Sequence, residues 1–108
     1  MSHVQQITSS QFSSEVLQSQ VPVLVDFYTT WCPPCRALAP HLDRLATDFA
    51  DCAKVLKVNV DEEPRLAAQY RIQGVPTLIL FSGGQPIKQL AGADPYTLRQ
   101  MLSQACAA

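Results

Sequence analysis

The sequence predicts an α/β fold in which a mixed five-stranded sheet is covered on both faces by four helices. Short apolar runs alternate with amphipathic segments along the chain, which is typical of parallel strands connected by helices. The last two apolar runs are separated only by a short turn with a glycine pair, which indicates an antiparallel hairpin at one edge. The predicted order is therefore β-α-β-α-β-α-β-β-α.

Size and composition indicate one packed domain over residues 1–108. Hydrophobic residues make up 47% of the chain and charged residues 16%, so most of it is packed. A net charge of −1 provides no basic surface for nucleic acid, and no run is long and apolar enough to span a membrane. The first residues lack the basic and apolar regions of a signal peptide. We therefore expect a cytosolic monomer.

The first third of the chain predicts a strand, a helix and a second strand. Residues 4–7 form the short first strand, and residues 8–11 then match a capping box. The apolar face of the helix that this box begins consists of Phe12, Val16 and Leu17. Residues 21–28 are apolar on both faces apart from Asp26, which predicts a central strand covered on both sides.

The middle third predicts two helices on either side of a buried strand. The first helix runs to about Phe49 and contains Pro40, where we expect a kink. Residues 53–60 form the buried strand. Pro64 stands where the second helix can begin. The apolar face of that helix consists of Leu66, Ala67 and Tyr70.

The last third predicts the hairpin and a closing helix. Residues 77–81 and 87–90 form its strands, and the glycines at 83–84 permit the positive φ of a tight turn. The Asp-Pro pair at 94–95 is typical of an N-cap followed by the first helical residue. The apolar face of this helix consists of Leu98, Met101 and Leu102.

The most informative residues are Cys32 and Cys35, between the central strand and the next helix. A helix N-terminus has unpaired N–H groups and the positive end of the macrodipole, so a cysteine there ionises more easily and becomes a nucleophile. This spacing also lets two sulfurs form a disulfide or share a metal ion. Zinc commonly takes four ligands from two spaced pairs. The remaining candidate ligands are isolated: Cys52, Cys106, His3 and His41. The pattern therefore favours redox chemistry over zinc.

Asp26 is the second candidate functional residue. A carboxylate inside an apolar strand is desolvated, which raises its pKa unless it is paired. Such a group can carry protons, or it can belong to a structural ion pair, and both alternatives stay open at this stage.

Taken together, these motifs resemble the thioredoxin family over essentially the whole chain. The segments that carry the resemblance are Val25-Asp26-Phe27, Trp31-Cys32-x-Pro34-Cys35, Pro40, Lys57-Val58-Asn59-Val60-Asp61, Gly74-Val75-Pro76-Thr77, Gly84 and Gly92. The resemblance implies the thioredoxin fold. It also implies a thiol–disulfide oxidoreductase that reduces protein disulfides.

The resemblance also implies roles for single residues. We expect Cys32 to be the exposed attacking thiolate and Cys35 the resolving thiol one turn into the helix. Asp26 would lie beneath Cys35 and exchange a proton with it, and Lys57 on the neighbouring strand would be its charge partner. The Val75–Pro76 bond is expected to be cis, which leaves the Val75 backbone free to pair with an extended substrate.

An apolar surface around Cys32 is expected to bind substrate. Its members are Trp31, Pro34, Val60, Gly74, Val75, Pro76, Ala91 and Gly92. The chain departs from the family at Pro33, where glycine is usual. Pro33 and Pro34 lack N–H groups, so two potential donors to the Cys32 thiolate are absent. Each proline also biases the preceding residue towards extended geometry, so we expect Cys32 and Pro33 to lie outside the helix.

The implied partners are disulfide-containing proteins and a thioredoxin reductase. No cofactor is expected on this chain, because electrons would come from that reductase, either flavin-dependent (FAD) with NADPH or ferredoxin-linked. Two other functions remain open. The same cysteines could serve an oxidase or isomerase, and the chain could be a thioredoxin-fold binding subunit whose redox activity is secondary.

Cys52 and Cys106 are expected to be free thiols. Cys52 follows the helix that begins at the redox motif, and Cys106 ends the last helix. Both helices start near the active site, so both cysteines should lie about 20 Å or more from Cys32. Disulfides that persist are uncommon in the cytosol, which favours two unpaired cysteines over a second disulfide.

Overall fold

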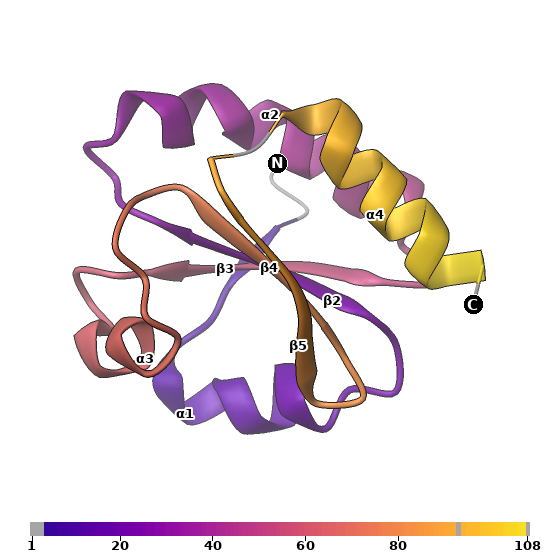
Figure 1. Cartoon of the computed structure of the whole chain (residues 1–108), viewed down its shortest axis with the longest axis horizontal. Coiled ribbons are helices and arrows are strands. Elements are labelled where there is room, and N and C mark those ends of the chain that lie inside the picture. Colours follow the sequence, from indigo (N-terminus) through magenta and orange to yellow (C-terminus); the bar gives the residue numbers. More distant parts are fainter. Residues whose placement is uncertain (1–3, 93, 108) are drawn as a thin grey trace.

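The computed structural model describes residues 4–92 and 94–107, so His3, considered above as a zinc ligand, lies outside the described residues. Within them the chain folds into one mixed sheet with helices on both faces (Figure 1). The elements are β1 (Gln5–Gln6), α1 (Ser9–Phe12) with a π-helical turn (Ser13–Leu17), β2 (Val23–Tyr28), α2 (Pro33–Asp48), β3 (Lys54–Asn59), α3 (Pro64–Gln69), β4 (Thr77–Ser82), β5 (Gln85–Ala91) and α4 (Pro95–Ala107).

The strand order in the sheet is β1-β3-β2-β4-β5. Strands β1, β3 and β2 are parallel, whereas β4 is antiparallel to both β2 and β5. The predicted mixed sheet with a C-terminal hairpin is therefore confirmed. β2 lies at its centre, and its first five side chains are buried.

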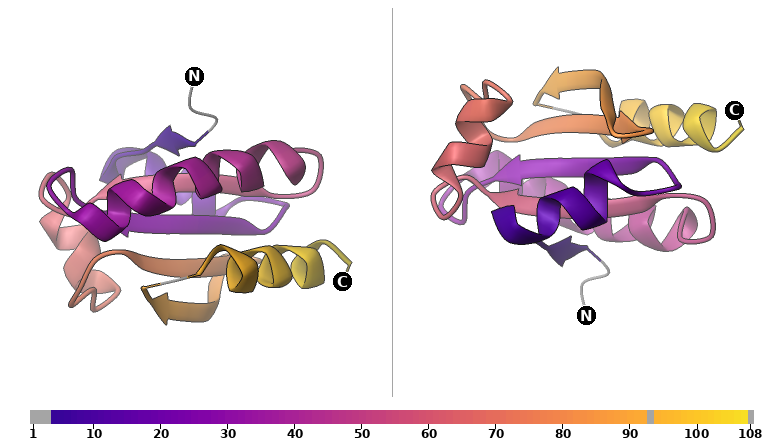
Figure 2. Two further views of the ribbon diagram at one scale, coloured as in Figure 1. Left: turned by 90° about the horizontal axis from the view of Figure 1, so that it is seen from above. Right: turned by 90° about the horizontal axis from the view of Figure 1, so that it is seen from below.

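The two faces of the sheet carry separate hydrophobic cores. Helices α2 and α4 cover one face, and α1 and α3 cover the other (Figure 2). Because side chains alternate along a strand, Leu24 belongs to the first core, whereas Val23, Val25 and Phe27 belong to the second. Asp26, an even-numbered position, therefore points to the face covered by α2.

Local signals in the sequence set several element ends. The backbone N–H of Thr8 donates to Gln11 Oε1 at 2.9 Å at the start of α1, as the capping box predicts. The backbone N–H of Thr97 donates to Asp94 Oδ1 at 3.0 Å at the start of α4. Gly84 has φ +80°, and a Cβ there would lie 2.8 Å from the carbonyl oxygen of Leu17, so this position requires glycine.

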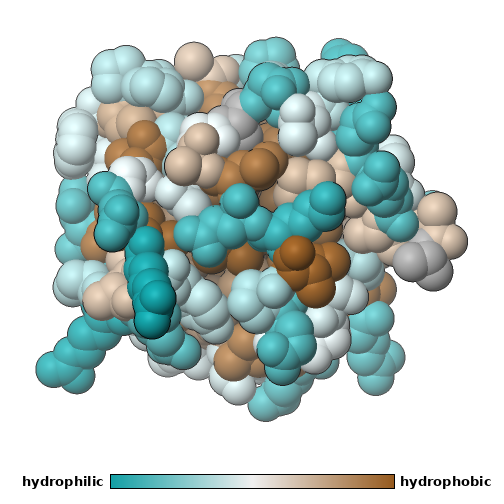
Figure 3. All heavy atoms as spheres, in the orientation of Figure 1, coloured by the Kyte–Doolittle hydropathy of each residue, from teal (hydrophilic) through white to brown (hydrophobic). Residues whose placement is uncertain are grey.

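β5 forms an edge of the sheet and is largely exposed to solvent. The face over β5 is mostly hydrophilic, with small hydrophobic areas between polar side chains (Figure 3). Pro86 and Lys88 lie on this strand, and both residue types oppose pairing with a further strand. No helix within the described ranges is long and apolar enough to cross a membrane.

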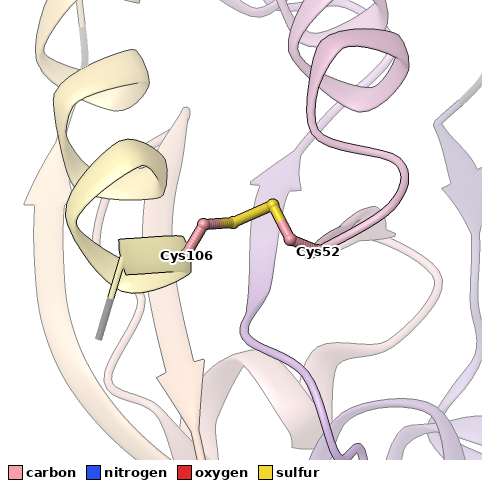
Figure 4. Close-up of a disulfide and its surroundings, with 2 residues drawn as sticks. All are labelled: Cys52 and Cys106. Atoms are coloured by element: carbon pink, nitrogen blue, oxygen red, sulfur yellow. A yellow bond between two sulfur atoms is a disulfide. The ribbon is translucent and has the colours of Figure 1, made fainter.

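Cys52 and Cys106 form a disulfide, so the prediction of two free thiols is wrong (Figure 4). Their Cα atoms lie 5.8 Å apart, Cys52 in the loop after α2 and Cys106 in the last turn of α4. Helices α2 and α4 run side by side in the same direction, which brings their C-terminal ends together (Figures 1 and 2). The sequence analysis placed both cysteines at this end, but it did not predict that the two helices are neighbours.

A second contact joins the same two helices near the disulfide. The guanidinium of Arg99 on α4 forms an ion pair with Asp48 at 2.7 Å and lies 5.6 Å from the centre of the Phe49 ring. The ion pair is partly exposed and therefore contributes little by itself. The covalent bond is the stronger link between α2 and α4.

The disulfide is expected to stabilise the fold by restricting the unfolded chain. The sequence separation of 54 predicts that Cys52→Ser/Cys106→Ser lowers the free energy of unfolding by about 4 kcal/mol. Urea titration of oxidised wild type and variant measures the difference. A Cys32→Ser/Cys35→Ser protein is the matched control, because it should lose the same stability when a reductant opens Cys52–Cys106. Equal midpoints for variant and oxidised wild type would contradict the expectation.

Candidate redox site

The two cysteines of the redox motif lie at the N-terminus of α2. Cys32 is the N-cap, with extended backbone angles, and Pro33 is the first helical residue. The backbone N–H of Cys35 donates to Cys32 Sγ at 3.2 Å, and Cys32 Sγ donates to the carbonyl oxygen of Val75 at 3.7 Å. Both thiols are free in this structure. The predicted position of Cys32 at the helix entrance, with Cys35 one turn inside, is confirmed.

Two details of this entrance differ from the sequence expectations. Cys32 is only 3% exposed, so the prediction of an exposed thiol is wrong. Its sulfur lies between the N-terminus of α2 and the Val75 carbonyl, and these contacts bury it. Pro33 lies inside the helix, because the first helical N–H has no partner in the helix and its loss costs nothing. The N–H of Cys35 remains as a backbone donor to the Cys32 sulfur.

Asp26 is buried beside these cysteines. Its side chain is 4% exposed, and Oδ1 accepts no hydrogen bond from any residue that the structure describes. Burial raises the pKa of Asp26 from its usual 3.8 to about 7, although the positive charge of Lys57 opposes the shift. Lys57 lies directly beside Asp26 in the parallel register of β2 and β3. The expected desolvated carboxylate and its neighbouring lysine are therefore both present.

Cys35 faces the same region as Asp26. Burial, the hydrogen bond with Cys32 and the charge of Asp26 raise the pKa of the Cys35 thiol to about 12. A cavity of about 270 Å³ is lined by both residues and by Lys57. Cys35 therefore keeps its proton at neutral pH, and Asp26, whose pKa lies near 7, is a titratable group that lines the same cavity.

A groove of about 670 Å³ lies on the other side of Cys32. Besides Cys32, its lining includes six of the residues predicted at the substrate surface or in the redox motif: Trp31, Pro33, Pro34, Val60, Gly74 and Val75. Trp31 is 66% exposed, and its indole N–H donates to Asp61 at 2.9 Å, which fixes the ring at the rim. An exposed aromatic side chain held in place is suited to contact a partner protein.

Three predicted members of this surface do not line the groove. Ala91 pairs with Thr77 in the hairpin, and the N–H of Gly92 donates to the Pro76 carbonyl at 2.7 Å. The Val75–Pro76 bond is cis, as the resemblance implied. Ala91 and Gly92 therefore contact the segment that directly follows Val75.

Thr29 and the wall of the groove formed by α3 were not predicted from the sequence. Thr29 lines both the cavity and the groove, and its buried hydroxyl has no hydrogen-bond partner among the described residues. A polar residue directly after a buried strand was the available signal. Pro64, Ala67 and Ala68 complete the groove, but a short helix with one small apolar face gives no such signal.

Within residues 4–92 and 94–107, no three His, Cys, Asp or Glu side chains lie close enough together to hold a metal ion. The ionisable groups at the centre of this site are two thiols, one carboxyl group and one ammonium group. A helix N-terminus favours the thiolate form of a cysteine, which is the attacking species, and a second thiol needs a base within reach to lose its proton. Cys32, Cys35 and Asp26 meet both needs.

The raised pKa of Asp26 makes stability depend on pH. The folded protein binds one more proton than the unfolded chain between pH 3.8 and about 7, so its stability falls as the pH rises through this window. Asp26→Asn removes the free-energy cost of ionising a buried carboxyl group. The substitution is expected to increase the free energy of unfolding by up to about 4 kcal/mol above pH 7 and by little below pH 4.

Urea unfolding at pH 4 and about pH 8 measures this difference. Asp51→Asn, which changes an exposed carboxylate, is the control and should have little effect at either pH. A gain in stability for Asp26→Asn that is equal at both pH values would show that the carboxyl is not titrating in this window.

Comparison with known proteins agrees with this geometry. The family model described as Thioredoxin matches residues 3–104. Thioredoxin 1 of Nostoc sp. is 50% identical over 97 residues, which cover 90% of this chain and 91% of that protein. Thioredoxin 1 of Synechococcus elongatus is 47% identical over the same shares. A bifunctional thioredoxin reductase/thioredoxin of Mycobacterium leprae is 43% identical over 82% of this chain and 19% of its own length. The chain belongs to the thioredoxin family and is a thiol–disulfide oxidoreductase.

Proposed function

We propose that this chain reduces disulfides of other proteins through Cys32 and Cys35, with Asp26 as the acid–base group. The observation that carries the proposal is the position of Cys32, whose sulfur accepts the Cys35 N–H at a helix N-terminus. A buried carboxyl group with a pKa of about 7 lines the same cavity as Cys35. Together these features provide an attacking sulfur, a resolving sulfur and a base for its proton.

The reaction proceeds in two exchange steps. The Cys32 thiolate attacks one sulfur of the substrate disulfide, forms a mixed disulfide and releases the first substrate thiolate. Cys35 then transfers its proton to Asp26 and attacks Cys32 Sγ. The mixed disulfide breaks, the second substrate thiolate leaves, and a Cys32–Cys35 disulfide forms. The substrate gains the two electrons that the pair of cysteines loses.

The groove beside Cys32 is the proposed substrate site. An extended peptide can lie along the segment at Val75 and add to it as a strand, with apolar side chains against Trp31 and Val60. Because the Cys32 sulfur is nearly covered, the substrate must displace its contact with the Val75 carbonyl to reach it. Substrate binding and exposure of the nucleophile are therefore linked at Val75.

A thioredoxin reductase is the proposed source of electrons. The Mycobacterium leprae relative, a bifunctional thioredoxin reductase/thioredoxin, supports this partner. The family resemblance suggests either a flavin enzyme that uses NADPH or a ferredoxin-linked one. We place the monomeric chain in the cytosol, because a disulfide reductase needs a continuous supply of reductant.

Insulin reduction in the presence of a reductase or dithiothreitol tests the proposal. Cys32→Ser should abolish turnover, because no nucleophile remains. Cys35→Ser should instead trap a covalent mixed disulfide between Cys32 and the substrate, which non-reducing electrophoresis and mass mapping detect. Cys52→Ser/Cys106→Ser is the matched control and should retain turnover. A trapped adduct at Cys52 or Cys106 in place of Cys32 would contradict the assignment.

Pro33→Gly is expected to raise the reduction potential of Cys32–Cys35 by about 10 to 20 mV. Glycine gives the dithiol loop more backbone freedom and returns one N–H near the Cys32 sulfur, and both changes favour the dithiol. Equilibrium with glutathione, followed by alkylation and mass analysis, measures the potential. The experiment uses a Cys52→Ser/Cys106→Ser background so that a single couple is titrated. An unchanged or lower potential would contradict this reasoning.

A further inference from the structure

A lysine and a tyrosine meet above the cavity that contains Asp26. Tyr28 follows Asp26 by two positions on β2, so both side chains point to the same face of the sheet. Lys57 lies beside Asp26 on β3, and its Nζ lies 5.3 Å from the centre of the Tyr28 ring. This distance is within the range of a cation–π contact. The Lys57 ammonium group is thus held by the ring of Tyr28, which lies two residues along β2 from Asp26.

The Tyr28 ring is itself anchored. Its hydroxyl donates to Gln6 Oε1 at 2.6 Å, and Gln6 Nε2 donates to Glu62 Oε1 at 3.2 Å. These bonds connect β2 to β1 and to the loop after β3. A half-buried ring that is fixed at its polar end offers Lys57 a face in a defined place. A free lysine side chain would instead sample many rotamers and lose entropy on being held.

The same cavity is lined by Asp26, Tyr28, Cys35 and Lys57. The positive charge of Lys57 lowers the pKa of Asp26, against the larger effect of burial. The strength of this effect depends on how near the ammonium group stays to the carboxyl group, because Coulomb energy falls with distance. A group that fixes the position of Lys57 therefore controls the ionisation of Asp26 without touching it.

We propose that Tyr28 is a positioning residue whose ring holds the Lys57 ammonium at the cavity and so favours the ionised form of Asp26. The expected effect on catalysis rests on the proposed role of Asp26 as the base for Cys35. The effect on ionisation does not, since it requires only that the three side chains lie as described.

Other charged groups face the cavity and must be kept constant. Arg36 and Asp43 line it from α2, Cys35 lies in the first turn of the same helix, and Glu62 acts on Tyr28 from the loop after β3. A double-mutant cycle between Tyr28 and Lys57 cancels their contributions, because they are the same in all four proteins.

The test follows the Asp26 carboxyl carbon by NMR in the reduced protein labelled at aspartate. Tyr28→Leu should shift the Asp26 titration midpoint upward by about 0.5 pH, because the ammonium group is released. Lys57→Met should shift it upward by at least as much. Tyr28→Leu added to Lys57→Met should cause no further shift. Tyr28→Phe, which keeps the ring and loses the bond to Gln6, should shift the midpoint less than Tyr28→Leu, because the ring face stays beside Lys57.

A downward shift in Tyr28→Leu would overturn the proposal, because it would mean that the ring keeps Lys57 away from Asp26. An equal upward shift with and without Lys57 would overturn it too, since the effect would then be independent of the lysine. If Tyr28→Leu does not fold, Tyr28→Trp replaces it. The larger aromatic face should hold the ammonium at least as well and place the midpoint at or below that of wild type, so an upward shift would refute the proposal.

The pH profile of insulin reduction separates this proposal from the proposed function. If Asp26 is the base, the profile of Tyr28→Leu should move upward together with the NMR midpoint. A profile that stays in place while the NMR midpoint moves would count against Asp26 as the base and leave the positioning role of Tyr28 intact. If the wild-type protein fails to reduce insulin at any pH, that result would count against the proposed function alone.

Discussion

The burial of β2 on both faces is the constraint on which the rest of this structure depends. Its neighbours β3 and β4 cover its edges, and two separate cores cover its faces. A carboxyl group on such a strand is largely removed from water, so burial raises the pKa of Asp26 to about 7 even with Lys57 beside it. The end of the same strand leads directly into Cys32. One strand therefore sets both the ionisation of the carboxyl group and the position of the attacking sulfur.

The site has two separate hollows. Asp26, Cys35 and Lys57 line a small cavity, and Trp31 and Cys32 line a groove. Thr29 touches both spaces. The proposed acid–base group, Asp26, therefore lies outside the lining of the groove that is proposed to bind substrate.

Sequence patterns predicted the order of strands and helices because each element carries its own local signal. The capping residues at Thr8 and Asp94 and the glycines of the hairpin act within a few residues. The order of strands in the sheet, and the antiparallel pairing of β2 with β4, depend on contacts between distant segments and could not be obtained in this way. Asp26 could be identified because a single charge interrupts an apolar run. The burial of Cys32 depends on Val75, far away in the chain, and was missed.

The redox state of the Cys52–Cys106 disulfide determines which covalent form of the protein an assay measures. Both cysteines are partly accessible, so a thiol reagent added to maintain the Cys32–Cys35 dithiol also meets this distant bond. Preparations kept with and without such a reagent then differ by two thiol hydrogens and by the disulfide bond that links the C-terminal ends of α2 and α4. Melting temperatures recorded under the two conditions describe different covalent species, and activity measured at high temperature depends on the history of the sample.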